Sequence, residues 1–406
     1  MKYLFDIKFK FSILTLLIVS VIVSSCNKDV EQLGDITQPQ RSGLTLNQLI
    51  KNNPDDSLYY RLMMKGGQVA MISDSSKMFT MFVPNNEAMR NVIASLAGIP
   101  ISPLIPNFIF SQVITNLITV EQAAALVQYN TIPQAITTSH IPGVFPNFFY
   151  PSTFNPLPTL SSLLRLNVYP STRNNGWFNN LPLTSVNTMA YNGVIHHCAG
   201  LAVPPGATNQ FIWDRINSDT GLTYLKAAIV RADSGTSPGF LQGALSNIGA
   251  NLTLFAPNNA AFKKVLVKMI SRVLLNSIPD TTTAINTAIT LASSPAVFSN
   301  PSLYAALPAQ QVKGLLAYHL LDSRAFTNNF SKTAESVKTL LGLPVMLKAN
   351  FGNPFVNSAT VKGLGNTVPV NIVINTTPLT ADPDGTSDQL YLNGIMHEID
   401  DILMPY

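Results

Sequence analysis

The chain has 406 residues, which is enough for two or three domains that each bury a core. Charged residues make up only 11% of it, against about 25% in a typical soluble domain, so its polarity rests on neutral side chains. The net charge of +4 is small, and no basic stripe follows the first 25 residues, which argues against a nucleic-acid partner.

Residues 1–25 have the pattern of a lipoprotein signal peptide. MKYLFDIKFK is a basic start, and FSILTLLIVSVIV is an apolar run of 13 residues, the length of a signal-peptide core and short for a membrane span. The run ends in VSSC, which resembles the lipobox of bacterial lipoproteins. We therefore predict that Cys26 carries the lipid and begins the mature chain. The alternative is an ordinary secretory signal in which this cysteine has no role.

Residues 26–43 are polar, contain Pro and Gly, and are predicted to be a flexible tether. Lys-Asp-x-Glu directly after Cys26 is similar to the export signal of Bacteroidetes surface lipoproteins. We expect an outer-membrane anchor with the protein facing the cell exterior, and a periplasm-facing anchor is the alternative. Acylation of Cys26 would leave Cys198 without an intramolecular disulfide partner.

The rest of the chain repeats itself once. TMFVPNNEAM (80–89) recurs as TLFAPNNAAF (253–262). In each copy a β-prone run meets a proline, Pro84 or Pro257, which cannot donate a ladder hydrogen bond. The following asparagine, Asn85 or Asn258, suits a helix N-cap. The unit is therefore a strand, a sharp corner and a capped helix. Further helices are expected ahead of each unit, at 44–53 and 221–230.

A second landmark lies between the ends of each copy. VQYNTIPQAI (127–136) stands opposite AYHLLDSRAF (317–326), which aligns Tyr129 and Asn130 with Tyr318 and His319. The spacing from the proline to this tyrosine is larger in the second copy. We therefore predict an insertion within 266–303, where TTTAINTAITLA suggests an extra helix.

The third landmark closes each copy: YNGVIHHCAGLAVPP (191–205) and LNGIMHEIDDILMPY (392–406). Asn192-Gly193 and Asn393-Gly394 are expected to supply the positive backbone angles of a tight hairpin corner. Side chains alternate along the strand that follows, so His196 and His197 point to opposite faces and do not chelate one metal together. We expect His196 and His397 on an inward face, each hydrogen-bonded to a loop, and His197 on the outside. Cys198 is interpreted as a small buried apolar residue.

Together these residues resemble the fasciclin domain. The family pattern is a strand-Pro-Asn-helix opening, a central Tyr-His, and a closing Asn-Gly-x-x-His with a terminal Leu-x-x-Pro. The second copy carries all of it, whereas the first has Asn130 in place of the His and Ala199 in place of the usual Asp. The copies span 44–205 and 208–406. The resemblance implies an α+β chain of two tandem fasciclin-like domains, each a β-sandwich-like wedge with packed helices.

For function, the same resemblance implies a non-catalytic domain of adhesion and extracellular binding. In animals the family's Tyr-His and closing-strand regions are linked to receptor contacts. For Tyr318, His319 and His397 we expect instead a role in holding the fold together. Departures at Asn130 and Ala199 suggest that the first copy serves a different use from the second.

Motifs for chemistry are absent from the sequence. It has no G-x-S-x-G, H-E-x-x-H or G-x-x-x-x-G-K-[ST], and its histidines have no Cys or carboxylate at convincing metal-ligand spacing. DPDGTSD (382–388) imitates the start of a calcium loop, but the Glu needed later in such a loop is missing, and we interpret it as a plain turn. We therefore expect no enzyme activity, no metal and no cofactor.

One segment of the first copy is dense in aromatic residues. Between 145 and 178, rings alternate with Pro, Asn and Ser, and Phe148, Tyr150, Trp177 and Phe178 are the candidates for ligand binding. Such rings can stack on sugars, or they can belong to the core or to an interface between domains. We expect a lipid-anchored cell-surface binding or adhesion protein whose partner is an extracellular protein or glycan. The alternative is a glycan-binding accessory lipoprotein of an outer-membrane polysaccharide uptake system.

Overall fold

The computed structural model describes residues 43–99, 102, 104–159, 161–205, 210–236, 239–375 and 385–406. All of these residues belong to one compact unit. The predicted signal peptide, Cys26 and nearly all of the predicted tether lie outside the described residues, as do the first three residues of DPDGTSD. No helix in the described part is both long and apolar enough to cross a bilayer.

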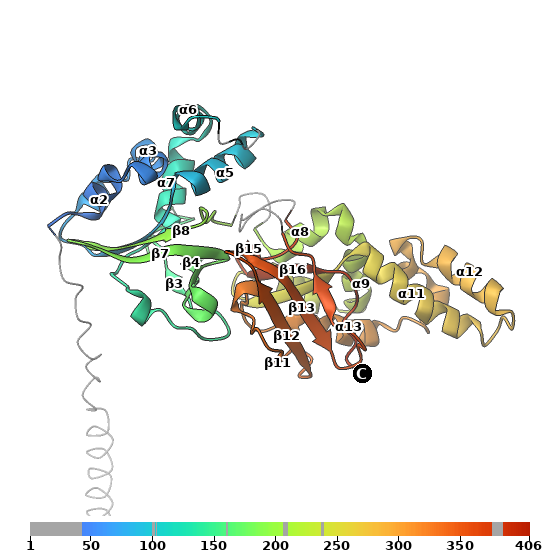
Figure 1. Cartoon of the computed structure of the whole chain (residues 1–406). Helices are drawn as coiled ribbons and strands as arrows, with labels where there is room; N and C mark the ends of the chain where they lie inside the picture. The colour runs from blue at the N-terminus through green and yellow to red at the C-terminus, as the bar shows by residue number, and fades with distance from the viewer. Residues whose placement is uncertain are drawn as a thin grey trace, which may run out of the picture. The chain divides into compact units, whose positions relative to one another are not determined.

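The first half of the unit is a mixed set of helices and strands (Figure 1). Its helices are α2 (Leu46–Asn52), α3 (Ser57–Lys65), α4 (Val69–Ser73), α5 (Asn86–Ala97), α6 (Asn107–Leu117) and α7 (Val120–Tyr129), with short 3₁₀ turns η1 (Pro54–Asp56), η2 (Thr138–His140) and η3 (Arg173–Asn175). Its strands are β1 (Phe79–Pro84), β2 (Thr131–Ile132), β3 (Tyr150–Pro151), β4 (Asn167–Val168), β5 (Pro170–Ser171), β6 (Trp177–Phe178), β7 (Leu181–Ala190) and β8 (Gly193–Cys198).

The second half repeats this order. Its helices are α8 (Ile212–Ser218), α9 (Thr223–Ala232), α10 (Phe240–Ser246), α11 (Asn259–Leu274), α12 (Thr281–Leu291) and α13 (Ala309–Ala317), with 3₁₀ turns η4 (Thr220–Leu222), η5 (Pro295–Ser299), η6 (Pro301–Leu303) and η7 (Thr327–Asn329). Its strands are β9 (Leu252–Pro257), β10 (Leu320–Leu321), β11 (Glu335–Lys338), β12 (Pro344–Phe351), β13 (Val356–Gly363), β14 (Val370–Ile372), β15 (Gln389–Tyr391) and β16 (Gly394–Ile399).

Each half is built on a sheet with the same central pairing. The opening strand lies parallel to the closing strand, β1 beside β8 and β9 beside β16, and the short β2 or β10 lies antiparallel on the other edge of the opening strand. The order is β2-β1-β8-β7-β6-β5 in the first sheet and β10-β9-β16-β14-β13-β12-β11 in the second, with β15 also paired to β16. This duplicated arrangement of helices and strands confirms the predicted α+β class.

The predicted corner unit is present in both halves. β1 ends at Pro84 and β9 ends at Pro257. Asn85 then caps α5 by accepting from the amide of Ala88, and Asn258 caps α11 by accepting from the amide of Ala261. A proline that cannot extend the ladder and a side chain that satisfies the first helical turn therefore fix where strand becomes helix.

The hairpin corners predicted at the Asn-Gly pairs are present, since Ala190 pairs with Gly193 and Tyr391 pairs with Gly394, but the asparagines do not supply positive backbone angles there. Neither Asn192 nor Asn393 has a positive φ. The Asn192 side chain instead accepts from the amide of Leu46 and donates to the carbonyls of Ile72 and Asp74. Asn393 likewise accepts from the Ile212 amide and donates to the Leu245 carbonyl. Both are buried clamps that hold the first helix of each half against its closing strand.

The glycines at these corners serve close approach between backbones. A Cβ at Gly193 would collide with the carbonyl oxygen of Phe79 on the parallel neighbour, and one at Gly394 would collide with that of Leu252. Gly193, with φ of 154°, is also the first residue of β8, paired with Ala190. A side chain at either position would push the opening and closing strands apart.

The helices predicted at 44–53 and 221–230 are both present, as α2 and α9, but they are not counterparts in the two halves. The element order pairs α2 with α8 and α3 with α9, so residues 221–230 match α3 and not the 44–53 segment. α12 is the counterpart of α6, because each packs on the helix that follows its opening strand. The larger spacing in the second half comes from the longer α11 and from the 3₁₀ turns η5 and η6.

Both faces of each closing strand are covered. In the first half, Ile195 belongs to the cluster under the helices, whereas Cys198 belongs to a second cluster with Phe82 and Phe178. Figure 1 shows α2, α3, α5, α6 and α7 gathered on one side of β7 and β8. The prediction that only the His196 face of the strand is buried was therefore incomplete, because the Ile195 face is buried as well.

The two halves pack against each other. The second cluster of the first half also contains Phe326, Leu390 and Ile395 from the second half. Polar contacts follow the same boundary: Asn147 accepts from the amide of Phe326, and Asn174 donates to the carbonyls of Asn328 and Phe330. The halves thus share part of one core.

Candidate functional site

The two histidines of the matched face are fully buried. His196 Nε2 lies 2.9 Å from the carbonyl oxygen of Ile136, and its Nδ1 accepts from the amide of Asn187. His397 Nε2 lies 2.9 Å from the carbonyl oxygen of Ala325, and its Nδ1 accepts from the amide of Asp388. Burial lowers the pKa of both imidazoles. Each neutral ring ties a loop to the closing strand, and neither reaches the surface.

The central Tyr-His landmark is buried as well. The Tyr318 hydroxyl donates to the carbonyl of Pro344 and accepts from the amide of Leu364. His319 donates from Nδ1 to the carbonyl of Leu315, accepts at Nε2 from the amide of Leu403, and has its pKa lowered by burial to about 4. With Tyr318, His319 and His397 enclosed, none of them offers a surface contact to a receptor.

Asn130 repeats the function of His319. Its side-chain amide donates to the carbonyls of Leu126 and Ala202, and its oxygen accepts from the amide of Ala202. His319 makes the equivalent link between its own helix and the segment after β16. Because Asn130 is buried and keeps the same link, this departure does not support a different surface use for the first half.

The prediction that His197 lies on the outside is wrong, because its side chain is only 16% exposed. Its Nε2 lies 3.2 Å from Oδ2 of Asp56 and its Nδ1 lies 2.9 Å from Oγ of Ser185. Asp56 is buried, and Ser185 is exposed on β7. In the second half Glu398 stands at the position of His197 and accepts from the Asn258 side chain. No motif of fixed spacing marks this cluster, because Asp56 lies far from His197 and Ser185 in the chain.

The four aromatic candidates separate into two pairs. Trp177 is 3% exposed and its ring centroid lies 6.0 Å from that of Phe351, while Phe178 is enclosed and stacks on Phe82 at 3.8 Å. Both belong to the core or to the boundary between the halves, so their assignment as ligand-binding residues was wrong. Phe148 is 46% exposed, and Tyr150 is half-buried with its ring centroid 5.2 Å from that of Phe148.

Phe149 joins this pair. Its ring stacks on Phe148 with centroids 5.9 Å apart, and its side chain is 52% exposed. The Tyr150 hydroxyl donates to the carbonyl of His140, which fixes one edge of the cluster. Phe148, Phe149 and Tyr150 are referred to below as the aromatic cluster. It keeps aromatic surface in reach of a ligand.

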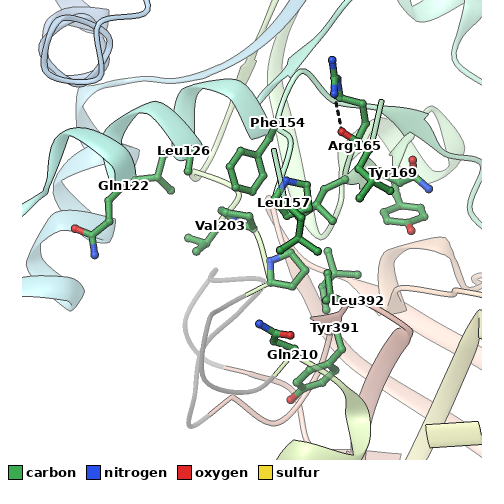
Figure 2. Close-up of a pocket in the computed structure, with 18 of the residues that line it drawn as sticks. Gln122, Leu126, Phe154, Leu157, Arg165, Tyr169, Val203, Gln210, Tyr391 and Leu392 are labelled. Atoms are coloured by element: carbon green, nitrogen blue, oxygen red, sulfur yellow. Dashed lines mark hydrogen bonds between the residues drawn. The ribbon is translucent and has the colours of Figure 1, made fainter. Parts of the chain in front are cut away.

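Phe149 also lines a pocket of about 1020 Å³ between segments of the two halves. Figure 2 shows Leu126, Phe154, Leu157 and Val203 on one side of it and Tyr391 and Leu392 on the other. Most of its lining residues are apolar, the charged ones are Arg165 and Arg324, and none is acidic. The Arg165 guanidinium is held by the carbonyls of Ser162 and Leu164, and Arg324 donates to the Tyr169 hydroxyl and the Leu392 carbonyl.

Away from the pocket, the described residues offer few groups for metal binding or catalysis. Within the described residues no group of three or more His, Cys, Asp or Glu side chains is placed to hold a metal ion. Cys198 is enclosed, and burial raises the pKa of its thiol well above the usual range. The described geometry therefore offers a pocket and the aromatic cluster for binding, and the Asp56–His197–Ser185 cluster for chemistry.

Residues 55–204 match the family model described as the fasciclin domain. Residues 55–204 therefore form a fasciclin domain. A solved structure described as a FAS1 domain pair from the insect cell adhesion molecule fasciclin I is similar, with 13% identity, a TM-score of 0.33, and coverage of 86% of this chain and 97% of that chain. No curated protein matches the chain.

The family match covers the first half, and the second half repeats the same order of helices and strands. The described chain is thus a tandem of two fasciclin-like folds. Fasciclin domains are adhesion-related, non-catalytic modules as a family. The two folds are held together by the buried hydrogen bonds of His196, Asn130, His319 and His397.

Proposed function

We propose that this fasciclin-domain protein is a lipid-anchored cell-surface binding module that engages an extracellular protein through the pocket between its two halves. The observation that carries the proposal is the pocket of about 1020 Å³, large and mostly apolar, with Phe149 of the aromatic cluster in its lining. Concave apolar sites with a few polar groups are where ligands and the apolar anchors of partner proteins bind. Attachment through Cys26 would display this site at the membrane surface.

The test is a charge placed in the pocket. Leu157→Asp puts a carboxylate on a lining side chain that is 44% exposed, so the fold should tolerate it. We expect the variant to lose at least about tenfold in affinity for a partner found in a matrix-protein screen, since burying an unpaired charge is costly. Leu364→Asp, on an exposed residue of the second half outside the pocket, is the matched control. Equal affinity for Leu157→Asp and the control would refute the pocket as the binding site.

A second candidate function is glycan binding by an accessory lipoprotein of an outer-membrane uptake system. The exposed aromatic cluster favours it, because ring faces stack on sugars. A glycan array with Phe148→Ala would test it, and Phe240→Ala, another exposed ring, would be the control. Glycan binding that depends on Phe148 and not on Leu157 would favour this function over the first.

The anchor is tested on Cys26, independently of the ligand. With Cys26→Ser, or in cells treated with globomycin, we expect no lipid attachment and release of the protein from the membrane fraction. Membrane fractionation with mass measurement of the mature N-terminus is the assay. Retention of the Cys26→Ser protein in the membrane fraction after its signal has been cleaved would contradict the lipoprotein prediction.

A further inference from the structure

Three side chains of the first fasciclin domain form a continuous hydrogen-bonded chain from the surface to the interior. Ser185 Oγ lies 2.9 Å from Nδ1 of His197, and Nε2 of the same ring lies 3.2 Å from Oδ2 of Asp56. Ser185 is exposed, the His197 side chain is 16% exposed, and the Asp56 side chain is 2% exposed. The hydroxyl therefore faces solvent while the carboxylate is enclosed.

The hydrogen bonds define the tautomer of His197. A carboxylate only accepts, so Nε2 carries the proton and donates to Asp56. Nδ1 is then the bare nitrogen, and the Ser185 hydroxyl donates to it. Asp56 Oδ2 also accepts from the side-chain amide of Asn53, which fixes the carboxylate from a second direction. A serine, an imidazole base and an orienting carboxylate in this order can activate a hydroxyl nucleophile, here with the two ring nitrogens exchanged relative to the serine-protease triad.

The backbone of β7 contributes to this placement. Its pairing with β8 is irregular on both sides of Ser185, between Leu183 and Ser185 and again between Ser185 and Thr188. Asn187 in the second irregularity has a φ of 62°. Bulges re-aim side chains on the strands that carry them. Ser185 is set directly opposite His197 in the register.

We propose that Ser185, His197 and Asp56 form a hydrolytic site for esters, with Ser185 as nucleophile and His197 as base. Ser185 Oγ bonds to the acyl carbon as its proton passes to His197 Nδ1. The ester C–O bond then breaks, and the leaving alkoxide takes that proton from His197. Water then attacks the acyl carbon as His197 takes one of its protons. The bond from the acyl carbon to Ser185 Oγ breaks, Oγ takes that proton back from His197, and the carboxylic acid leaves. Asp56 is a positioning residue that holds the ring and stabilises its protonated form.

The setting of Ser185 limits the substrate class. It is exposed on a strand and does not line the pocket. With its hydroxyl open to solvent, the site fits an unhindered acyl ester that projects from a larger molecule. The second fasciclin domain has Glu398 at the position of His197, so the activity belongs to the first domain alone.

A second serine–histidine pair in the chain, Ser139 and His140, shows what such a contact looks like without an orienting carboxylate. Ser139 Oγ lies 3.3 Å from Nδ1 of His140, and Thr137 Oγ1 lies 2.9 Å from the same atom. Both Ser139 and His140 are exposed, and the described structure gives His140 no carboxylate partner. An exposed serine beside a histidine is thus present with and without the orienting carboxylate.

The experiment treats the full-length protein with a fluorophosphonate probe and locates adducts by peptide mass. In this reaction a Ser Oγ–P bond forms, fluoride leaves, and His197 takes the hydroxyl proton. We expect an adduct on Ser185 at least about tenfold faster than on Ser139, and none there with Ser185→Ala. Hydrolysis of p-nitrophenyl acetate should fall with the same variant. Asp56→Asn keeps the shape of the orienting side chain, and it should slow labelling of Ser185 at least about tenfold.

Thermal melts of each variant show whether the fold is retained. Ser185→Ala removes an exposed hydroxyl and should melt within a few degrees of the wild type. If Ser185 in the wild type is labelled no faster than Ser139, the proposal is wrong and the three residues only tie η1 to the sheet. A rate of labelling that Asp56→Asn leaves unchanged in a folded protein would also overturn it.

Discussion

Acidification from pH 7 to pH 4.5 is expected to destabilise the protein by several kcal/mol. Three histidines, His196, His319 and His397, are enclosed as neutral rings and have lowered pKa values because burial disfavours the charged form. Each ring also accepts a backbone amide on one nitrogen. A proton added there would face an N–H group, so protonation and these hydrogen bonds are incompatible.

The sign follows from which state binds more protons. In the unfolded chain a histidine titrates near pH 6.5, whereas the folded pKa of His319 is about 4. Between these values the unfolded chain binds the proton and the folded chain does not, so stability is retained above pH 6.5 and lost as pH falls toward 4. His319 alone accounts for about 3 kcal/mol over that range, and His196 and His397 act in the same direction.

His319→Asn separates this effect from other acid sensitivity. Asn130 already makes the equivalent latch in the first domain, so Asn at 319 supplies a donor and an acceptor without a titrating ring. Chemical denaturation at several pH values between 4.5 and 6.5 gives the slope of the unfolding free energy. The variant should show a shallower slope by up to about 1.4 kcal/mol per pH unit. An unchanged slope would mean that His319 charges in the folded state too.

Trp177→Ala should destabilise the protein by about 3–5 kcal/mol, the usual cost of removing a large buried ring. Its indole is enclosed, donates from Nε1 to the carbonyl of Asn174, and packs beside Phe351 of the second domain. The loss therefore falls on the boundary between the domains as well as on the first core. Denaturant unfolding of the protein, followed by fluorescence or circular dichroism, measures it.

Phe148→Ala is the control for Trp177→Ala, because its ring is exposed by 46% and leaves no enclosed cavity. We expect that change to cost about 0.5 kcal/mol or less. Suppose instead that Trp177→Ala unfolds at the wild-type denaturant concentration and yet abolishes binding of a glycan. The tryptophan would then be a ligand platform after all, and its assignment to the domain boundary would fail.

Local signals carried the secondary structure well. A β-prone run that ends in Pro-Asn encodes both the end of a strand and the start of a helix, because each residue acts on its immediate neighbours. Asn85 and Asn258 therefore cap their helices as predicted. The sequence repeat also predicted the architecture, because two similar copies of one pattern are expected to build two similar folds.

Features that depend on residues far away in the chain were predicted less well. Asn-Gly is a common local turn, yet Asn192 clamps Leu46, and Gly193 makes room for Phe79. These partners lie far away in the chain, and a single sequence does not say which segments meet. Trp177 and Phe178 failed as ligand residues for the same reason, since nothing local distinguishes an exposed ring from one covered by the second domain.

The Asp56–His197–Ser185 cluster could not be predicted from the sequence for the same reason. Ser185 and His197 are 12 residues apart, but Asp56 precedes His197 by 141. No motif of fixed spacing describes such a set. An inspection of His197 from sequence alone shows only an alternating strand and predicts an outward ring. The pocket is assembled in the same way, from segments that span both domains.

The parallel pairing of opening and closing strands also sets an order of events during synthesis. Gly193 follows its partner Phe79 by 114 residues, and Gly394 follows Leu252 by 142. Until the ribosome has released the last strand of a domain, its opening strand lacks its central neighbour, and the first helix lacks the asparagine that clamps it. Contacts this distant in sequence make folding slow. Each domain must therefore stay open through most of its translation and close in one late step.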